Sequence, residues 1–445
     1  MHALAASPMH RAGRAFLNCT GEWPGQARAV QRRIGGVLRP AAGHLLRQTL
    51  PCSVGVLAFT SPLWAANGLV SPGNGTTQLG MAGAGTALAE DPAATIRNPA
   101  AGVWMGSGRT FDLGLAVPKG GYNVGPVGPE SKTGIFEISP GRDSSVTGVF
   151  PLPTFAYNRR VNDDNAWGIG VSVAGLKSLS SGNTATLARG IRGLEAHCAG
   201  TYGSGDPVAG NDDPQHLCGH SGADAGVNLA QLYLSAYWAQ RLLPNLSLGV
   251  APVFLAQRLS IRGLGTFAAF SDYPDQTSDN GGDVAFGGGA RAGLLWEVGA
   301  GVGVGLAYQS RIWTTDFNKY RGLVIGGALD QAPIYILGLQ FHVTPGLRML
   351  VDVEHIAYGE VRTLRNGFET QRFTDECLAP RLLTRLGAKS SGGNDASCLG
   401  GRNGPGFGWR DMTVFKLGSE FRSGRLTTRA GYSYGRQPLR DGQIL

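Results

Sequence analysis

The spacing of the connections between strands constrains this 445-residue chain more than any other feature. From residue 109 onward, segments of alternating apolar and polar residues are separated by connections that are in turn very short and very long. Alternation within a segment is typical of a β-strand with two different faces. The expected strands are residues 109–122, 153–161, 166–180, 227–242, 246–264, 283–298, 302–316, 331–343, 347–361, 409–421 and 426–437.

Short and long connections alternate strictly along this series. The short turns are residues 162–165, 243–245, 299–301, 344–346 and 422–425. The long loops are residues 123–152, 181–226, 265–282, 315–330 and 362–408. Transmembrane antiparallel β-barrels have tight turns at one end and long loops at the other, whereas a soluble sandwich has no reason to sort its loops. The sequence therefore predicts an all-β, transmembrane-barrel fold over residues 107–445.

The two faces of an expected strand differ in polarity. In residues 283–298, Phe286 and Trp296 belong to one face, while Arg291 and Gly293 belong to the other. A charge that faces lipid near the bilayer midplane costs roughly 2–4 kcal/mol, so charged residues are expected to point into a polar lumen lined partly by glycine. The lumen candidates are Arg291, Asp352, Glu354, Lys416, Glu420 and Arg429. They form either an ionic network that holds a plug or salt bridges unrelated to gating.

Residues 78–105 differ from the rest of the chain because they are rich in small residues and compatible with helix. Asp91 followed by Pro92, and Asn98 followed by Pro99, each place an N-cap residue before a proline at the first helical position. We therefore expect two short helical turns. Small side chains also let this backbone lie close to a surrounding wall, which predicts a plug. An ordinary Ala-rich surface helix is the alternative.

The order of motifs in this segment resembles the N-terminal signature of the FadL/TodX family of outer-membrane transporters for fatty acids and aromatic hydrocarbons. The motifs are Leu-Gly-Met-Ala-Gly-Ala-Gly at 79–85, Ala-Glu-Asp at 89–91 and Asn-Pro-Ala at 98–100. In that family the segment folds inside a 14-stranded barrel, and the Asn-Pro-Ala motif belongs to the plug. The resemblance implies a hatch over residues 67–106. Its gating residues would be Gly80, Gly83, Gly85, Asp91, Asn98, Pro99 and Ala100.

The resemblance also predicts three strands beyond the eleven expected here. Residues 429–438 are similar to the strand and loop that precede the last three strands of the family, and the chain stops at Leu445 without a terminal aromatic strand. We therefore expect a truncated barrel. In the resembled family a kink in the third strand opens a lateral exit toward the bilayer. Gly168, Gly170 and Gly175 would permit a bulge in that strand.

The basic charge of the chain is concentrated in residues 1–66. These carry seven arginines and one acidic residue, a net charge of +6 out of +8 for the chain. Arg47, an apolar run over 50–63 and Trp64-Ala65-Ala66 are typical of a secretory signal peptide cleaved after Ala65 or Ala66. The charge therefore belongs to an export leader and indicates no nucleic-acid partner. The sequence has no uninterrupted apolar run of about 18 residues, so a helical membrane span is not expected.

Four cysteines after the leader fall into two local pairs. Cys198 and Cys218 share one long loop with a separation of 20 residues, and Cys377 and Cys398 share another with a separation of 21. In an exported protein this spacing predicts two loop disulfides. The alternative for the first loop is a zinc site made of His197, Cys198, His216, Cys218 and His220. Disulfides are favoured because the second loop has the same pairing without any histidine.

No catalytic site, metal site or cofactor is expected from the sequence. Gly219-His220-Ser221-Gly222 is close to a nucleophile elbow, but it lies in a glycine-rich loop and not at a strand-to-helix turn. We expect a monomer, in contact with lipid, in the outer membrane of a Gram-negative bacterium. The predicted function is passive, plug-gated uptake of hydrophobic small molecules, either long-chain fatty acids or aromatic hydrocarbons. The alternatives are a general porin and, less favoured, a barrel lipid hydrolase that uses Ser221.

Overall fold

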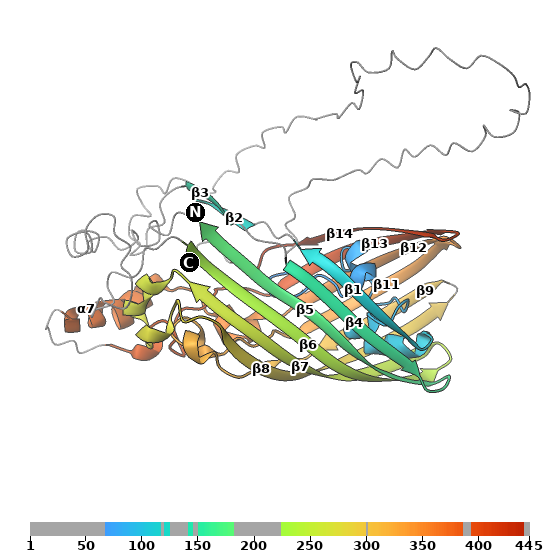
Figure 1. The fold of residues 1–445 in the computed structure, drawn as a ribbon, viewed down its shortest axis with the longest axis horizontal. Helices are drawn as coiled ribbons and strands as arrows, with labels where there is room; N and C mark the ends of the chain where they lie inside the picture. The colour runs from blue at the N-terminus through green and yellow to red at the C-terminus, as the bar shows by residue number, and fades with distance from the viewer. Residues whose placement is uncertain are drawn as a thin grey trace, which may run out of the picture. The chain divides into compact units, whose positions relative to one another are not determined.

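The strands expected from the turn spacing form one antiparallel sheet (Figure 1). The structure is a computed structural model, and it describes residues 67–116, 120–124, 141–145, 150–181, 224–299, 301–385 and 393–439. The order within the sheet follows the sequence: β1 (Gly108–Ala116), β4 (Phe150–Arg160), β5 (Asn165–Ser181), β6 (Asp224–Leu243), β7 (Leu246–Arg262), β8 (Asp283–Gly299), β9 (Val302–Gln309), β11 (Ile334–Thr344), β12 (Leu347–Ile356), β13 (Met412–Ser423) and β14 (Leu426–Gly435). The short strand β10 (Trp313–Thr314) adds to β8, and β2 (Gly120–Val124) pairs with β3 (Gly141–Ser145) in a separate small sheet.

The five predicted short turns are confirmed. They join β4 to β5, β6 to β7, β8 to β9, β11 to β12 and β13 to β14. Successive strands run in opposite directions, so these turns share one end of the sheet and the long loops share the other.

Three expected strands end five or more residues earlier than predicted. The strand β1 is described as far as Ala116, and the strand expected over 347–361 ends at Ile356, before the 3-10 turn η7 (Tyr358–Glu360). The strand expected over 302–316 stops at Gln309. After it, Ile312 exchanges backbone hydrogen bonds with Gln331, and the chain pairs with β8 again at β10.

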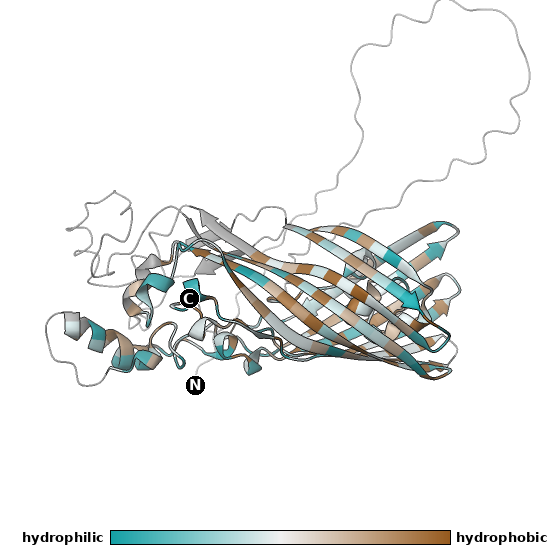
Figure 2. Cartoon of the chain, turned by 60° about the horizontal axis from the view of Figure 1, so that its bottom comes forward, coloured by the Kyte–Doolittle hydropathy of each residue, from teal (hydrophilic) through white to brown (hydrophobic). Residues whose placement is uncertain are grey.

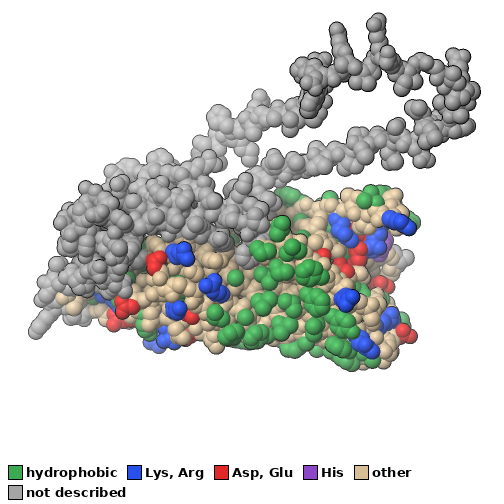
Figure 3. All heavy atoms as spheres, in the orientation of Figure 1, with side chains coloured by type: hydrophobic (Ala, Val, Ile, Leu, Met, Phe, Trp, Pro, Cys, Tyr) green, Lys and Arg blue, Asp and Glu red, His purple; other side chains and the backbone are tan. Residues whose placement is uncertain are grey.

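The outer face of the sheet is apolar and exposed. In β13, Phe415 and Leu417 are 55% and 46% exposed, whereas Lys416 and Glu420 are 1% exposed. Hydropathy alternates along the strands (Figure 2), and hydrophobic side chains form a band over the strands with charged side chains toward both ends (Figure 3). The prediction that charges of the strands turn away from this face therefore holds for β13. Among the described helices, none is long and apolar enough to cross a membrane.

Residues 67–106 lie against the opposite face of the sheet. The segment contains α1 (Gly75–Gly80), α2 (Ala94–Arg97) and the 3-10 helix η1 (Pro99–Trp104), so the two predicted helical turns near 91 and 98 are present. Helix α1 contacts β1, β4 and β14, while η1 contacts β4 through β8. One short segment reaches strands along the whole sheet because the sheet curves around it (Figure 1).

Strands β1 and β14 are the two ends of the strand order, and no ladder joins them within the described residues. Helix α1 contacts both of these edges. Its Thr76 hydroxyl donates a hydrogen bond of 2.7 Å to the Asp112 carboxylate of β1. Helix α1 therefore contacts the sheet at both of its edges.

Short helices fold over the end of the sheet that carries the long loops. They are η3 (Gly265–Phe270), η4 (Pro274–Gln276), η5 (Asn318–Tyr320), η6 (Ile325–Gly327), α5 (Arg362–Arg365), α6 (Thr370–Phe373), the π-helix η8 (Thr374–Leu378), α7 (Ala379–Arg385) and η9 (Asp395–Ser397). The predicted disulfide between Cys377 and Cys398 is confirmed, and its sulfurs are buried beside Phe270, Phe373 and Leu399. The expected partner loop with Cys198 and Cys218 lies outside the described residues, as do the leader over 1–66, the alternative zinc ligands and Ser221.

Candidate functional site

A row of glycines, one on each of seven strands, touches residues 81–100. A Cβ atom placed on any of them would lie less than 3.0 Å from an atom of that segment. This row, called the glycine cradle below, consists of Gly170, Gly249, Gly293, Gly305, Gly338, Gly418 and Gly431. Only glycine lets strand and segment approach so closely. Here the inner face is lined by glycine, as strand alternation predicted.

Asn98 joins the N-terminal segment both to itself and to the sheet. Its side-chain oxygen accepts a hydrogen bond of 3.1 Å from the N–H of Ala100, which caps η1 ahead of Pro99. Its amide nitrogen donates to the carbonyl oxygens of Thr86 at 2.9 Å and Leu294 at 3.0 Å. The predicted Asn-Pro-Ala motif is therefore buried at the contact between η1, the preceding turn and β8.

The other predicted hatch residues shape the turns around α1 and α2. Gly83 and Gly85 have φ angles of +85° and +135°, a region that residues with a side chain rarely adopt. Gly80 is the last residue of α1. The Asp91 carboxylate accepts a hydrogen bond of 2.8 Å from the N–H of Ala93, which closes the turn that leads into α2. These positions form the segment, and their part in gating stays a prediction.

The carbonyl groups of η1 receive hydrogen bonds from the sheet. A 3-10 helix this short leaves most of its carbonyls without partners of their own. The donors are the Ser247 hydroxyl to Ala100 at 2.9 Å, the Asn158 amide to Gly102 at 3.1 Å and the Arg241 guanidinium to Val103 at 3.2 Å. The Asn158 amide also donates to the carbonyl of Gly106, after the end of η1, at 2.9 Å. Side chains of β4, β6 and β7 thus fix η1 in place.

Four charged side chains are buried beneath the segment: Arg97, Asp352, Glu354 and Lys416. The Glu354 carboxylate lies 3.3 Å from Arg97 Nη1 and pairs with the Lys416 ammonium. Arg97 and Lys416 both donate to the carbonyl oxygen of Pro72, at 3.0 Å and 2.8 Å. Two cations therefore face two carboxylates, and their contacts fix residue 72 as well as α2.

Asp352 binds the turn between Gly85 and Thr86. Its Oδ2 accepts hydrogen bonds from both backbone N–H groups at 3.0 Å and from the Thr86 hydroxyl at 2.7 Å. Register places Asp352 directly opposite Lys416 on β13. Three of the predicted lumen residues, Asp352, Glu354 and Lys416, are thus brought together at one point of the segment.

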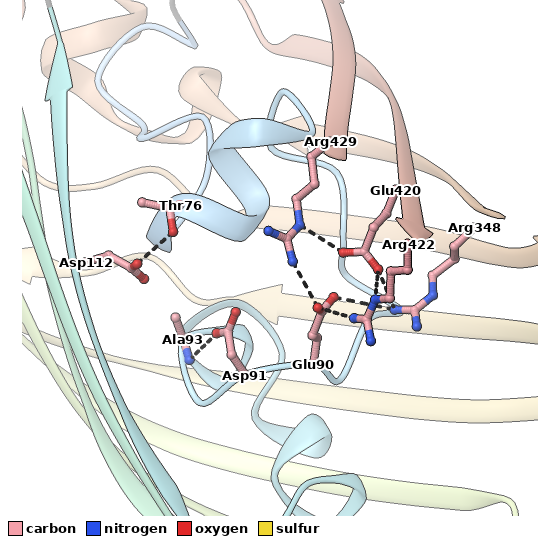
Figure 4. A network of polar contacts seen from close by, with 9 residues as sticks. All are labelled: Thr76, Glu90, Asp91, Ala93, Asp112, Arg348, Glu420, Arg422 and Arg429. Carbon is pink, nitrogen blue, oxygen red and sulfur yellow. Dashed lines mark hydrogen bonds and ion pairs between the residues drawn. The ribbon is translucent and has the colours of Figure 1, made fainter. Parts of the chain in front are cut away.

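A second charged cluster lies near the short turns and is centred on Glu90 (Figure 4). Glu90 pairs with Arg429 at 2.9 Å, with Arg348 at 3.6 Å and with Arg422. The Glu420 carboxylate accepts hydrogen bonds of 2.8 Å from the Nε atoms of Arg422 and Arg429. These five residues are called the Glu90 cluster. Burial, together with the nearby Glu420 carboxylate, raises the pKa of Glu90.

A cavity of about 60 Å³ lies between α2 and the sheet. It has room for roughly four water molecules. Its lining includes the apolar side chains of Val70, Ile96 and Ile334 and the guanidinium of Arg291. Arg291 donates hydrogen bonds of 2.7 Å to the Ile96 carbonyl and 2.8 Å to Gln309. The predicted lumen residue Arg291 therefore belongs to this cavity and to neither charged cluster.

The ladder between β4 and β5 ends before the strands do. It begins near the short turn and stops at the pair Thr154 and Ser172, although β5 continues to Ser181. Strand β5 keeps an unshifted register with β6 over its whole length, so the bulge envisaged at Gly168, Gly170 and Gly175 is absent from that ladder. Ser172 and the next inward residue, Ala174, also line the cavity.

Two prolines explain where this ladder stops. The N–H of Val161 bonds to Asn165 at the start of β5, while the N–H of Arg160 bonds to Ser107 on the other side. Because N–H directions alternate along a strand, the nitrogens of Pro151 and Pro153 face β5. Proline has no N–H to donate, so β4 donates no backbone hydrogen bond to β5 at these two positions.

Sequence reasoning missed several charged partners of the predicted residues: Glu90, Arg97, Arg348 and Arg422. Glu90 and Arg97 stand inside the motif-bearing segment, and their charge among small residues was an available signal. Arg348 and Arg422 flank short turns, and only the strand register brings them beside Glu90. Within the described residues, no group of three or more His, Cys, Asp or Glu side chains is placed to hold a metal ion.

Solved structures share this fold, although no protein-family model and no curated protein matches the chain. The toluene transporter TbuX of Ralstonia pickettii is 19% identical, with a TM-score of 0.50 over 82% of this chain and 87% of that chain. A Pseudomonas aeruginosa FadL homologue is 16% identical over 85% and 83% of the two chains, with a TM-score of 0.48. The Pseudomonas putida toluene transporter TodX is 16% identical over 82% and 84%, with a TM-score of 0.46. The likeness to TbuX shows the fold, and the family resemblance of the N-terminal motifs stays a prediction.

Proposed function

We propose that this protein is an outer-membrane channel for the passive uptake of hydrophobic small molecules, with residues 67–106 as its hatch. The glycine cradle carries the proposal, because the inner face of the sheet is fitted to a segment of the same chain. An open aqueous pore would not need a segment packed this closely against its wall. The apolar outer face suits a lipid environment, and TbuX, which shares the fold, is named as a toluene transporter.

The geometry supports a route with three stages. An apolar molecule, a long-chain fatty acid or an aromatic hydrocarbon, would pass the helices at the long-loop end and enter the cavity beside Arg291. Occupancy would shift α2, whose Ile96 carbonyl is bound by that arginine. The molecule would then leave toward the bilayer where β4 and β5 are unpaired beyond Ser172. The protein would act as a monomer after removal of the leader.

Uptake by a strain that lacks the gene tests this proposal. The strain is complemented with the full-length gene or with a gene lacking residues 78–105, and accumulation of labelled toluene and oleate is measured beside leakage of a hydrophilic antibiotic. We expect the full-length protein to restore hydrophobic uptake without leakage. The deletion should admit the antibiotic, because the cradle is then empty.

The alternatives give different results in the same assay. A general porin would leave hydrophobic uptake unchanged when residues 78–105 are deleted, and the full-length protein would already leak. A lipid hydrolase would release fatty acid from lipid, and Ser221→Ala would abolish the release. If the full-length protein restores neither toluene nor oleate uptake, the proposed function is wrong.

A further inference from the structure

Two exposed cationic side chains contact the same glycine at the long-loop end of the outer face. Arg258 of β7 and Lys319 of η5 both lie beside Gly282. A Cβ atom on Gly282 would lie 2.4 Å from Arg258 Nη2, so the guanidinium lies flat against the glycine backbone. The Lys319 ammonium donates a hydrogen bond of 3.2 Å to the Gly282 carbonyl. The two positive charges are therefore held near each other, which costs energy unless an anion offsets it.

The carboxylates in the neighbourhood do not pair with these two cations. Asp283 uses its oxygens to accept backbone hydrogen bonds from Lys319 at 2.8 Å and Val284 at 3.0 Å. Within the described residues, no ion pair joins either Arg258 or Lys319 to a carboxylate. Counting Asp283, the net charge of the three groups is +1.

The apolar band begins directly below the two cations. Val284, 48% exposed, is the cross-strand partner of Arg258 on β8. Phe254 and Phe286 follow toward the middle of the strands, 47% and 50% exposed, with their rings stacked at 5.9 Å. Figure 3 shows positive side chains at the margin of the hydrophobic band. Cations above exposed aromatic rings match a lipid with a charged headgroup and apolar chains.

We propose that Arg258, Lys319 and Gly282 bind the phosphate of a membrane lipid whose acyl chains lie along Phe254 and Phe286. The guanidinium and the ammonium donate to phosphate oxygens, and burial of the chains against the rings adds apolar contact. The occupant is a phospholipid of the leaflet at the long-loop end. This inference rests on the membrane location proposed above and is independent of transport.

Native mass spectrometry of the purified full chain in a neutral detergent tests the site. The probes are dioleoylphosphatidylglycerol, dioleoylglycerol, which lacks the phosphate, and inorganic phosphate as a competitor. We expect the phospholipid to bind and the diacylglycerol to bind much more weakly. Inorganic phosphate should not displace the phospholipid at equal concentration. Arg258→Gln and Lys319→Gln should each weaken binding of the phospholipid roughly fivefold.

Two further variants separate a positioned site from general charge. Gly282→Ala keeps both cations but displaces the guanidinium, so it should weaken binding as much as Arg258→Gln does. Arg425→Gln removes an exposed cation at the opposite end of the sheet and should leave binding unchanged. Heat-dependent gel mobility checks that each variant is folded. Equal losses in Arg425→Gln, equal binding of diacylglycerol, or displacement by inorganic phosphate would each overturn the proposal.

Discussion

Single atoms decide whether the N-terminal segment fits its sheet. At Gly293 a Cβ atom would lie 2.0 Å from Asn98 Oδ1 and 2.9 Å from Pro99 Cδ. Gly293→Ala should therefore displace the Asn-Pro-Ala motif and lower the free energy of unfolding by roughly 1–3 kcal/mol, as overpacking does. Urea unfolding and hydrogen exchange over residues 94–105 measure both effects.

Gly288 supplies the matched control for this substitution. It lies on the same strand, points to the outer face and has nothing within 4 Å of an added Cβ. Gly288→Ala should leave both measurements unchanged. Equal behaviour of the two variants would mean that the cradle does not hold the segment.

The residues of the site were predictable to the extent that their signal was local. The cap at Asn98 and the inward direction of Lys416 and Glu420 follow from neighbours in the sequence. The pairing of Glu90 with Arg429 does not follow from sequence neighbours, because 339 residues separate the two. The register of β14 against β13 decides which arginine lies beside Glu90. For the same reason the glycine cradle was expected as a general lining, with Gly293 placed on the inner face but without its contact partner Asn98.

At the scale of elements, the interrupted β4–β5 ladder predicts the route by which a hydrophobic molecule leaves the channel. Replacing Pro151 and Pro153 with threonine gives β4 two N–H donors that face β5, so the ladder should extend toward the long loops. Hydrophobic uptake should then fall severalfold, while leakage of a hydrophilic antibiotic stays at the wild-type level. Pro252→Thr, at an exposed proline of β7, is the control and should leave uptake unchanged. Unchanged uptake in the Pro151/Pro153 variant would place the exit elsewhere.

The Glu90 cluster predicts a pH dependence of stability. Burial and Glu420 raise the pKa of Glu90 above its ordinary 4.5, so the folded protein holds this proton more tightly than the unfolded chain does. The resulting stabilisation is complete below pH 4.5 and is lost as the pH rises through the raised pKa. Glu90→Gln has no proton to lose. The unfolding free energy of wild type minus that of Glu90→Gln should therefore decrease over this window.

Urea unfolding of both proteins at pH 4, 5, 6 and 7 measures that difference. A difference between wild type and Glu90→Gln that rises with pH would show that ion pairs with the arginines outweigh burial.

Elements were predicted well where turns and alternation specify them and poorly where tertiary contacts do. All five short turns follow from residues near each turn. The helices α6 and α7 of the long-loop end were read as loop because they are short, and α6 packs Phe373 against the Cys377–Cys398 disulfide and the distant Phe270. The end of β12 was also misplaced, since Tyr358 turns inward to donate to Asn67 and accept from Leu69 at 3.1 Å.

At the scale of the whole sheet, the two faces differ in which side chains they bury and which they expose. The inner face buries charges and glycines against residues 67–106, and the outer face exposes leucine, phenylalanine and tryptophan. In water such an outer face would drive aggregation, whereas in lipid it needs no partner. The two faces of one strand therefore fit the membrane location proposed above.

A membrane location predicts that the free-energy cost of a charge on the outer face depends on its depth in the bilayer. Leu234 and Leu242 are both exposed on the outer face of β6, at 45% and 49%, but Leu234 lies mid-strand and Leu242 lies beside the short turn. In lipid, arginine should cost about 2–4 kcal/mol at the midplane and about 0–1 kcal/mol near the interface. Reversible folding into phospholipid vesicles should therefore show Leu234→Arg to be much more destabilising than Leu242→Arg. If the two variants cost the same, this face does not lie in a bilayer with the short turns at one surface.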